Sequence, residues 1–230
     1  MFVLVACEES QRVCKAFRDR GHIAFSCDIM QPSGGFPQWH IHVDALEIIN
    51  GGTFYTMNGD IWSVSKWDLI IAHPPCTYLT VSGNAWYNVE KYGEKAIERI
   101  KQREKAVQFF MSFINAECDR IAVENPIGYM NTHYKKPTQI IQPFEFGDPV
   151  KKSTCLWLKN LPPLKPTNIV DYEKYICSTG KTYSGAAKYA VDENGKILRY
   201  NDPKTKIIRS KTFPGIAAAM AEQWGFKNAL

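Results

Sequence analysis

The chain has 230 residues, of which 45% are hydrophobic, so it is long enough to bury a complete core as one domain. It contains no run of about 18 apolar residues, and its start, MFVLVACEES, lacks the basic lead of a secretion signal, which predicts a soluble, cytoplasmic protein without a membrane segment. Its seven cysteines include no CxxC pair, which favours reduced thiols over a disulfide framework or a metal site.

The net charge of +5 is unevenly distributed along the chain. Residues 1–150 hold 14 Lys and Arg against 17 Asp and Glu, whereas residues 151–211 hold 13 against 5. This asymmetry favours a polyanion such as nucleic acid as the partner of the later segment, although a solvated surface gives the same pattern.

Alternating strand and helix patterns open the chain. Residues 2–7 (FVLVAC) are continuously apolar and predict a buried strand. A helical pattern then runs from Ser10, a residue suited to cap a helix, to a stop at Gly21, and residues 22–28 (HIAFSCD) predict a second strand. A strand–helix–strand unit this short predicts a parallel sheet.

The alternation continues further along. Strands are predicted at residues 67–72 (WDLIIA), 120–125 (RIAVEN) and 153–160 (STCLWLKN), and apolar residues at helical spacing predict a helix over residues 94–117. The predicted fold is therefore α/β, a doubly wound, mostly parallel Rossmann-like sheet with a small irregular basic insert near the C-terminus.

Three parts of the chain are predicted. Residues 1–160 form the expected catalytic core, residues 161–208 the basic insert, and residues 209–230 an Ala-rich helix that packs back on the core. The insert interleaves lysines with tyrosines, a composition that suits phosphate contact and stacking on bases, and equally suits an ordinary surface loop.

Polar residues follow four predicted strands, at residues 6–10 (ACEES), Asp28, 73–76 (HPPC) and 124–126 (ENP). Because ligands of doubly wound sheets lie beyond the carboxyl ends of the strands, these residues are expected to meet at one edge. Asp28 stands where a carboxylate accepts hydrogen bonds from ribose hydroxyls, although a helix cap has the same pattern. The first turn has no glycine, which disfavours a dinucleotide and favours S-adenosylmethionine, a cofactor without phosphate.

The HPPC stretch places a thiol at a strand end. Its two prolines stiffen the turn and remove backbone donors, which predicts that Cys76 lies at the mouth of the strand rather than in the core. Glu124 follows a neighbouring strand. A thiol and a carboxyl group together can add covalently to an electron-poor ring while protonating one of its nitrogens. A small buried cysteine is the structural alternative.

Two motifs carry a resemblance to a known family. PPCTYLTVSG (74–83) and EN (124–125), separated by one long helix, resemble the catalytic motifs of the DNA cytosine-5 methyltransferases, and the resemblance to phage-encoded members covers nearly the whole chain. It implies that Cys76 attacks C6 of a flipped cytosine, that Glu124 stabilises the protonated N3, and that C5 receives a methyl group from S-adenosylmethionine. GDPVKKSTCLWL (147–158) resembles a motif with one Gln and two Arg, but Val150, Lys152 and Thr154 occupy those positions.

On this basis the expected partner is double-stranded DNA, read by the insert, and a monomer is favoured. Asp28 matches the family's ribose-binding acid, and Asp44 resembles the acid that reads the adenine amino group. The residues expected to be catalytic are Cys76, Glu124, Asn125 and Lys152. Those expected to bind the cofactor are Ala6, Cys7, Glu8, Ser10, Gln11, Asp28, Ile29, Asp44, Ala45, His73 and Pro74. Those expected to bind DNA are Pro75, Thr77, Thr80, Ser82, Lys181 and Lys188.

The sequence admits three other interpretations. An amino-methyltransferase shares the sheet, but its Asp/Asn-Pro-Pro-aromatic motif is replaced at both ends by His73 and Cys76. The same chemistry on RNA or a free nucleotide stays open, with the basic insert favouring a polymer. A catalytically inactive nucleic-acid-binding relative is supported by the altered first motif and the missing arginines, whereas the presence of both Cys76 and Glu124 argues against it.

Overall fold

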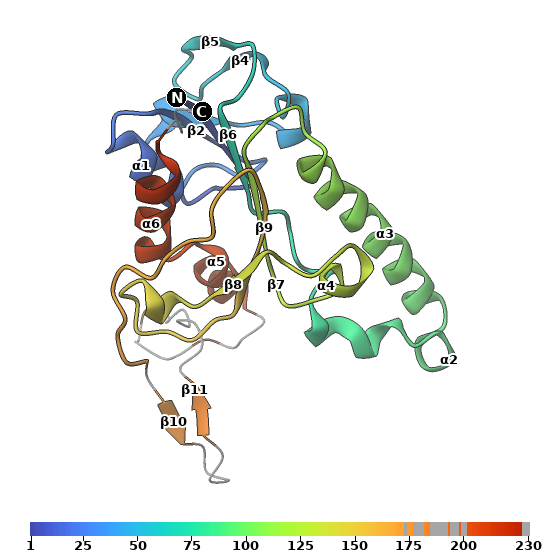
Figure 1. Ribbon diagram of the computed structural model, residues 1–230. Coiled ribbons are helices and arrows are strands. Elements are labelled where there is room, and N and C mark those ends of the chain that lie inside the picture. The colour runs from blue at the N-terminus through green and yellow to red at the C-terminus, as the bar shows by residue number, and fades with distance from the viewer. Residues whose placement is uncertain (173, 177–181, 185–192, 194–197, 199–201, 227–230) are drawn as a thin grey trace.

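The protein is an α/β fold built on a seven-stranded sheet, as the computed structural model shows in Figure 1. The structure describes residues 1–172, 174–176, 182–184, 193, 198 and 202–226. The strands of this sheet are β1 (Phe2–Ala6), β2 (Ile23–Cys27), β3 (His40–Ile41), β6 (Leu69–Ala72), β7 (Ile121–Pro126), β8 (Gln139–Ile141) and β9 (Thr154–Lys159).

The sheet is mixed but mostly parallel. Its order is β3-β2-β1-β6-β7-β9-β8, in which β9 is antiparallel to both of its neighbours and the remaining strands share one direction. Counted along the chain this is 3-2-1-4-5-7-6, the common doubly wound order 3-2-1-4-5-6 with one reversed strand inserted near the edge. The predicted α/β, mostly parallel sheet is therefore confirmed, in a form compatible with a Rossmann-like fold.

Helices cover both faces of the sheet (Figure 1). They are α1 (Arg12–Arg18), α2 (Val89–Tyr92), α3 (Glu94–Ile114), α4 (Met130–His133), α5 (Pro203–Ser210) and α6 (Pro214–Trp224). Val3 and Val5 share a core with α1 and α6, whereas Leu4 and Ala6 face the core under α3. Side chains alternate between the faces of a strand, so β1 is apolar throughout because both of its faces are covered.

Several short elements were not predicted. The strands β3 and β8 and the hairpin of β4 (Gly52–Tyr55) with β5 (Ile61–Val64) have two to four residues each, too few for a visible period. The remaining elements are β10 (Lys174–Ile176), β11 (Thr182–Ser184) and 3-10 turns at Pro37–Trp39, Ala45–Glu47, Val81–Tyr87 and Pro143–Glu145.

Two predicted boundaries need correction. The long helix expected over 94–117 ends at Ile114. The helix α5 begins inside the stretch 161–208 that was predicted to be irregular and ends beyond it at Ser210, because Asp202 caps its first turn and Pro203 occupies its first position. Much of the rest of the predicted insert lies outside the described residues.

The reversed strand determines how the chain reaches the insert. β9 begins beside the carboxyl end of β7 and finishes beside its amino end. Residues 161–172, here called the return strap, then run back along α6 and η4, the 3-10 turn Pro143–Glu145. The carbonyl of Pro162 accepts from Trp224 Nε1 at 3.0 Å, and the N–H of Val170 donates to the carbonyl of Phe144 at 2.9 Å. The strap thereby returns the chain to the carboxyl edge of the sheet.

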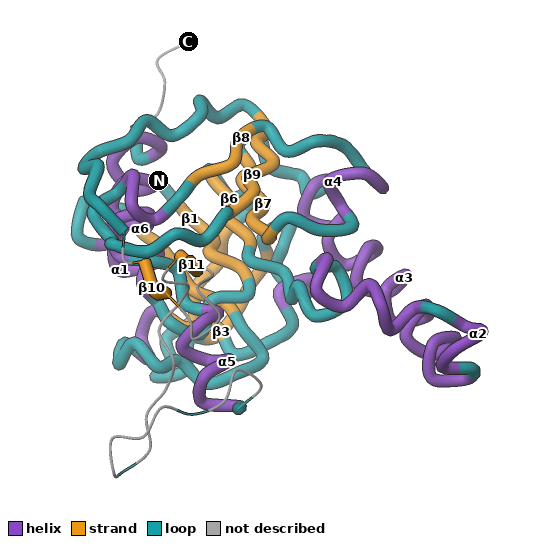
Figure 2. The backbone as a smooth tube through the Cα atoms, turned by 90° about the horizontal axis from the view of Figure 1, so that it is seen from below, coloured by secondary structure: helices purple, strands orange, loops and turns teal. Residues whose placement is uncertain are grey.

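Figure 2 looks onto that edge. The helix α5 and the pair β10–β11 lie in front of the strand ends, while α2 and the first turns of α3 project to one side. The carboxyl edge is therefore flanked by segments from the middle and the end of the chain.

Candidate active site

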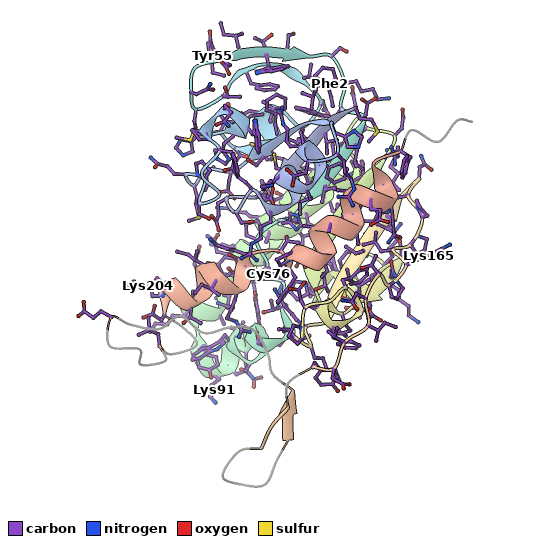
Figure 3. The ribbon with its side chains drawn as sticks, turned by 90° about the vertical axis from the view of Figure 1, so that its left-hand side faces the viewer. Phe2, Tyr55, Cys76, Lys91, Lys165 and Lys204 are labelled. Atoms are coloured by element: carbon purple, nitrogen blue, oxygen red, sulfur yellow. The ribbon has the colours of Figure 1, made fainter. Side chains whose placement is uncertain are left out.

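The predicted site residues lie at the carboxyl edge. The strand order reverses between β1 and β6, the position at which doubly wound sheets form their ligand crevice. The N–H of His73 donates to the carbonyl of Ala6 at 3.0 Å, so the loops after β1 and β6 start side by side. Figure 3 shows Cys76 in the middle of the molecule, toward the helices that carry Lys91 and Lys204.

The loop that carries Cys76 is fixed to the next strand. Asn125, only 2% exposed, donates through Nδ2 to the carbonyl of Pro74 at 2.8 Å. On the other side, the carbonyl of Cys76 accepts from the N–H groups of Leu79 and Thr80 at 2.9 and 3.1 Å. These bonds hold the backbone before and after a thiol that is itself partly exposed, and they make Asn125 a residue that positions the loop.

Glu124 is paired with a histidine. The Nδ1 of His73 lies 3.3 Å from Oε2 of Glu124, and the two side chains are 10% and 22% exposed. Burial raises the pKa of Glu124, but the hydrogen bond and the charge of His73, followed by the charge of Lys152, outweigh it and hold the pKa below its ordinary value. Glu124 is therefore a carboxylate at neutral pH.

The pKa of the Cys76 thiol is shifted upward, opposite to that of Glu124. Burial raises the pKa of Cys76 and the charge of Glu124 raises it further, while the charge of Lys152 opposes both. Glu124 and Lys152 are thus close enough to the thiol for their charges to act on its pKa. Cys76 rests as a protonated thiol and must lose its proton when it reacts.

Lys152 reaches this edge because β9 is reversed. It precedes Thr154, which lies opposite Pro126 at the carboxyl end of β7. Its Nζ donates to the carbonyl of Arg209 at 2.9 Å, in the last turn of α5. The Oγ1 of Thr154 donates to the carbonyl of Lys152 at 3.1 Å and is engaged within the chain. The unpredicted helix α5 therefore positions the cation of this motif.

The turn after β1 adopts left-handed backbone without glycine. Cys7 has φ +58° and Gln11 has φ +57°. Residues with a Cβ atom occupy this region at a cost of roughly 1–2 kcal/mol each, and such strain gathers at functional sites. The backbone here takes the conformation that glycine favours, although the sequence supplies none.

Glu8 shapes the same turn from inside. Its carboxylate is only 3% exposed and accepts from the N–H groups of Val13 and Cys14 at 2.6 and 3.1 Å. Glu8 therefore caps the helix that Ser10 was predicted to cap, and α1 starts two residues later than expected, at Arg12.

Two further residues expected to bind the cofactor have partners within the chain. Gln11 donates through Nε2 to the carbonyl of Phe36 at 2.8 Å, and its Oε1 accepts from the N–H of Phe36 at 3.0 Å. The hydroxyl of Ser10 lies 3.5 Å from Oε1 of Glu8. These side chains hold the turn together, and Gln11 ties it to the loop after β2.

Asp28 and Asp44 converge on the first turn. Burial raises the pKa of Cys7 well above its ordinary value, and the charges of Asp28 and Asp44 add to this effect. Asp44 also caps the 3-10 turn that begins at Ala45. Ile29 is 72% exposed and offers an apolar surface directly after Asp28. Residues after three strands thus share one region.

The charges of this region fit S-adenosylmethionine. Burial, and then the charge of Glu9, raises the pKa of Asp28, and Nζ of Lys211 lies 3.9 Å from Oε1 of Glu9. A pyrophosphate group would meet these carboxylates, whereas S-adenosylmethionine carries positive charge on its sulfur and its amino group.

The residues expected to contact DNA lie on the outer side of the Cys76 loop. Pro75 and Thr77 are exposed, and the hydroxyls of Thr80 and Ser82 lie 2.9 Å apart. Lys181 and Lys188 lie outside the described residues.

The joint between α5 and α6 was not predicted to belong to the site. Lys211 donates through Nζ to the hydroxyl of Ser33 at 2.7 Å, and Arg12 donates through Nη1 to the carbonyl of Thr212 at 2.7 Å. The joint therefore contacts the loop after β2 and the first residue of α1, and Arg209 contacts Lys152. Only the prolines that start α5 and α6 mark this joint in the sequence.

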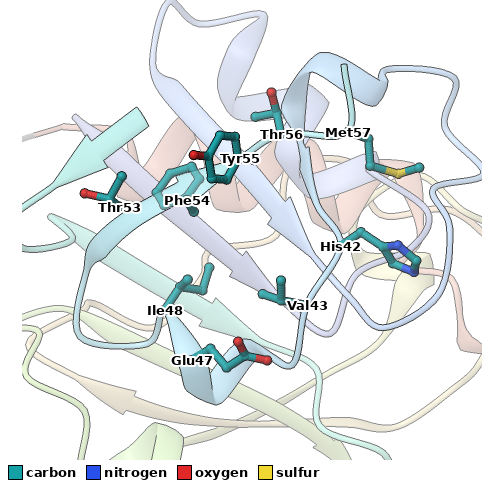
Figure 4. Close-up of a pocket in the computed structure, with 9 residues that line it drawn as sticks. All are labelled: His42, Val43, Glu47, Ile48, Thr53, Phe54, Tyr55, Thr56 and Met57. Atoms are coloured by element: carbon teal, nitrogen blue, oxygen red, sulfur yellow. The ribbon is translucent and has the colours of Figure 1, made fainter. Parts of the chain in front are cut away.

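A cavity of about 450 Å³ lies beside this region (Figure 4). It lies between the segment after β3, with His42, Val43 and Glu47, and the β4–β5 hairpin, with Phe54 and Tyr55. It borders the Asp44 turn and contains none of the catalytic candidates.

Within the described residues, no group of three or more His, Cys, Asp or Glu side chains could hold a metal ion, and no helix combines the length and apolar character needed to cross a bilayer. The sequence matches no protein-family model, and no similar curated protein was found.

Proposed function

We propose that the chain is a DNA cytosine-5 methyltransferase that uses S-adenosylmethionine. The observation that carries the proposal is the meeting of Cys76 and Glu124, from the ends of neighbouring parallel strands, at a separation where the charge of one raises the pKa of the other. The strand order 3-2-1-4-5-7-6 with its reversed seventh strand resembles the class I methyltransferase fold and adds support.

Cys76 is the proposed nucleophile. The thiol proton passes to water, Sγ bonds to C6 of a cytosine that has left the stack, and the electrons of the C5–C6 double bond move toward C5. After C5 has gained its methyl group, the proton on C5 passes to water and the electrons of that C–H bond restore the C5–C6 double bond. Sγ then leaves C6 as a thiolate, which takes up a proton from water to restore the thiol. Fixation of the loop by Asn125 favours this attack because it holds the thiol in place.

Glu124 acts on the other side of the ring. The exocyclic N4 of cytosine is a donor that a carboxylate accepts, and a carboxylate stabilises positive charge that develops when N3 is protonated. The lowered pKa of Glu124 supports a counter-charge, where the sequence analysis expected a ring-protonating acid. Lys152 lowers the pKa of both Cys76 and Glu124 and thereby favours both charged forms.

When bound, S-adenosylmethionine supplies an electrophilic methyl group. Asp28 and Asp44 are the proposed ribose and adenine contacts. Cys7 lies in the turn that ends β1, on the same side as these two aspartates. His73 lies between this turn and Glu124, because it pairs with Glu124 and its charge also acts on Glu8 in the turn.

A trapping experiment tests the function. The protein is incubated with S-adenosylmethionine and duplex DNA of mixed sequence in which 5-fluorocytosine replaces cytosine. Fluorine cannot leave C5 as a cation, so the adduct persists and appears as a band that survives denaturing electrophoresis. RNA and free nucleotide carrying the same base are run in parallel and identify the substrate.

The controls assign the thiol. Cys76→Ser is expected to abolish the band, because a hydroxyl is a far weaker nucleophile at neutral pH. Cys118→Ser is the matched control, since Cys118 is a buried thiol bonded to the carbonyl of Trp67, outside the site. Methylation of DNA without an adduct, or a band retained in Cys76→Ser, would show that the proposed mechanism is wrong.

A further inference from the structure

The function proposed above uses the lowered pKa of Glu124 but assigns no role to the pairing between His73 and Glu124 itself. The two residues are 51 positions apart, and Nδ1 of His73 approaches Oε2 of Glu124 to 3.3 Å in a region where the histidine side chain is only 10% exposed. Because a carboxylate accepts and does not donate, Nδ1 carries the proton in this contact.

The backbone holds the imidazole in place. The N–H of His73 donates to the carbonyl of Ala6 and continues the ladder between β1 and β6. Pro74 follows and restricts His73 to extended backbone, and the carbonyl of Pro74 accepts from Asn125. The ring is therefore fixed between β1 and β7 by contacts on both sides.

We propose that His73 is a positioning residue that fixes Oε2 of Glu124, presents the other oxygen of that carboxylate to the base, and takes the place of the motif arginine whose position Thr154 occupies in this chain. The inference rests on the proposed function. Val150 and Thr154 stand where the resembling motif has its Gln and one of its two Arg, and Lys152 is the one cation at these three positions. His73 provides the missing partner from a different strand.

The groups around the pair support this role. Cys76, Lys152 and Cys155 face Glu124 from the loop after β6 and from β9, and Glu8 faces His73 from the turn after β1. Burial would raise the pKa of Glu124, and His73 opposes this more strongly than Lys152 does. Nε2 of His73 is buried without a hydrogen-bond partner among the described residues. The contact of Nδ1 with Glu124 is therefore the hydrogen bond that this imidazole makes within the described residues.

The test measures Glu124 directly. The side-chain carboxyl carbons of all glutamates are labelled with ¹³C, and Glu124→Gln identifies the Glu124 resonance. In the free protein, without cofactor or DNA, Glu124 is expected to titrate below the ordinary range, which lies at about 4.3. His73→Leu is expected to shift its titration to higher pH. His73→Asn, which keeps a donor near the Nδ1 position but no charge, is expected to lie between the two, and His133→Asn serves as the control on exposed α4.

Adduct formation provides the second readout. With 5-fluorocytosine DNA, His73→Leu is expected to form the adduct roughly 10- to 100-fold more slowly, with partial rescue in His73→Asn. An unchanged Glu124 titration in both variants, or unchanged adduct rates, overturns the role of His73. If His73→Leu does not fold, His73→Asn alone decides. A wild-type protein that forms no adduct while the titration shifts as expected refutes the methyltransferase function and leaves the pairing established.

Discussion

Asn125→Ala is expected to destabilise the protein through the loop that carries Cys76. The side chain of Asn125 is 2% exposed, and its Nδ2 donates to the carbonyls of Pro74 and Glu124 at 2.8 and 3.1 Å. Alanine removes the donor and leaves the carbonyl of Pro74, a buried residue, without this partner. The variant therefore separates β7 from the loop while leaving every charge of the site in place.

The expected loss in the free energy of unfolding follows from the Pro74 carbonyl that Asn125→Ala leaves unpaired. A buried acceptor that loses its donor costs about 1–3 kcal/mol. The space left by the truncated side chain adds to this, so a loss of about 2–3 kcal/mol in the free energy of unfolding is expected. At about 2–4 °C per kcal/mol for a domain of this size, the melting temperature falls by about 4–12 °C.

Urea unfolding followed by tryptophan fluorescence measures this loss, and alkylation of Cys76 by iodoacetamide reports on the loop. The thiol is expected to react faster in Asn125→Ala because the loop is no longer tied down. Asn50→Ala is the matched control, since Asn50 accepts a hydrogen bond from the N–H of Glu117 at an exposed site, and a change within about 0.5 kcal/mol is expected there. An equally small change in Asn125→Ala would refute the claim that this bond holds the loop.

Three further predictions concern charge. Glu124→Gln is expected to speed alkylation of Cys76 at about pH 8, because it removes a charge that raises the pKa of the thiol, and Lys152→Gln is expected to slow it, because it removes a charge that lowers that pKa. Mass spectrometry of the peptide that contains Cys76 measures both rates. The opposite order of rates would contradict the placement of these two charges around the thiol. Burial raises the pKa of Asp28, so this carboxylate gains its proton at a higher pH than an ordinary aspartate does. Calorimetry is expected to show the affinity for S-adenosylmethionine falling as the pH is lowered, starting at a higher pH than an ordinary aspartate would cause, with Asp28→Asn binding weakly throughout. Tight binding of NAD instead would exclude the cofactor. Affinity for duplex DNA is expected to fall steeply as the salt concentration rises. The double variant Lys204→Gln with Lys206→Gln, and likewise Lys181→Gln with Lys188→Gln, is expected to reduce the slope of log affinity against log salt concentration by about 0.9 for each phosphate that is no longer neutralised. An unchanged slope would show that these lysines belong to the solvated surface and do not contact phosphate.

The long elements could be predicted from the sequence because their periodicity is clear. Continuous apolar runs predict strands at residues 2–7, 22–28, 67–72 and 120–125, and the sheet contains all of them as β1, β2, β6 and β7. The two residues of β3 and the three of β8 carry no period, and α5 is hidden in a lysine-rich stretch. The parallel pairing followed from the alternation of strands and helices, whereas the reversal of β9 did not.

Some residues of the candidate site could likewise be predicted from the sequence, and others could not. Cys76 and Glu124 were found because each directly follows, or ends, a recognisable strand. The contact of His73 with Glu124 could not be inferred, because it depends on a side-chain direction between residues far apart in the chain. The cap formed by Glu8 was also missed, since a carboxylate four residues before the helix is not the usual capping position and only the left-handed backbone at Cys7 and Gln11 turns it toward the helix.

The return strap and the cap of α5 attach both ends of the insert to the core. Residues 161–172 are held against α6 and η4 by contacts such as those of Lys165 and Pro162 with α6, and Asp202 begins α5 with its own cap. Both attachment points lie outside the seven strands of the sheet. Chimaeras that differ only between these two attachment points therefore provide a way to vary this segment on a constant core.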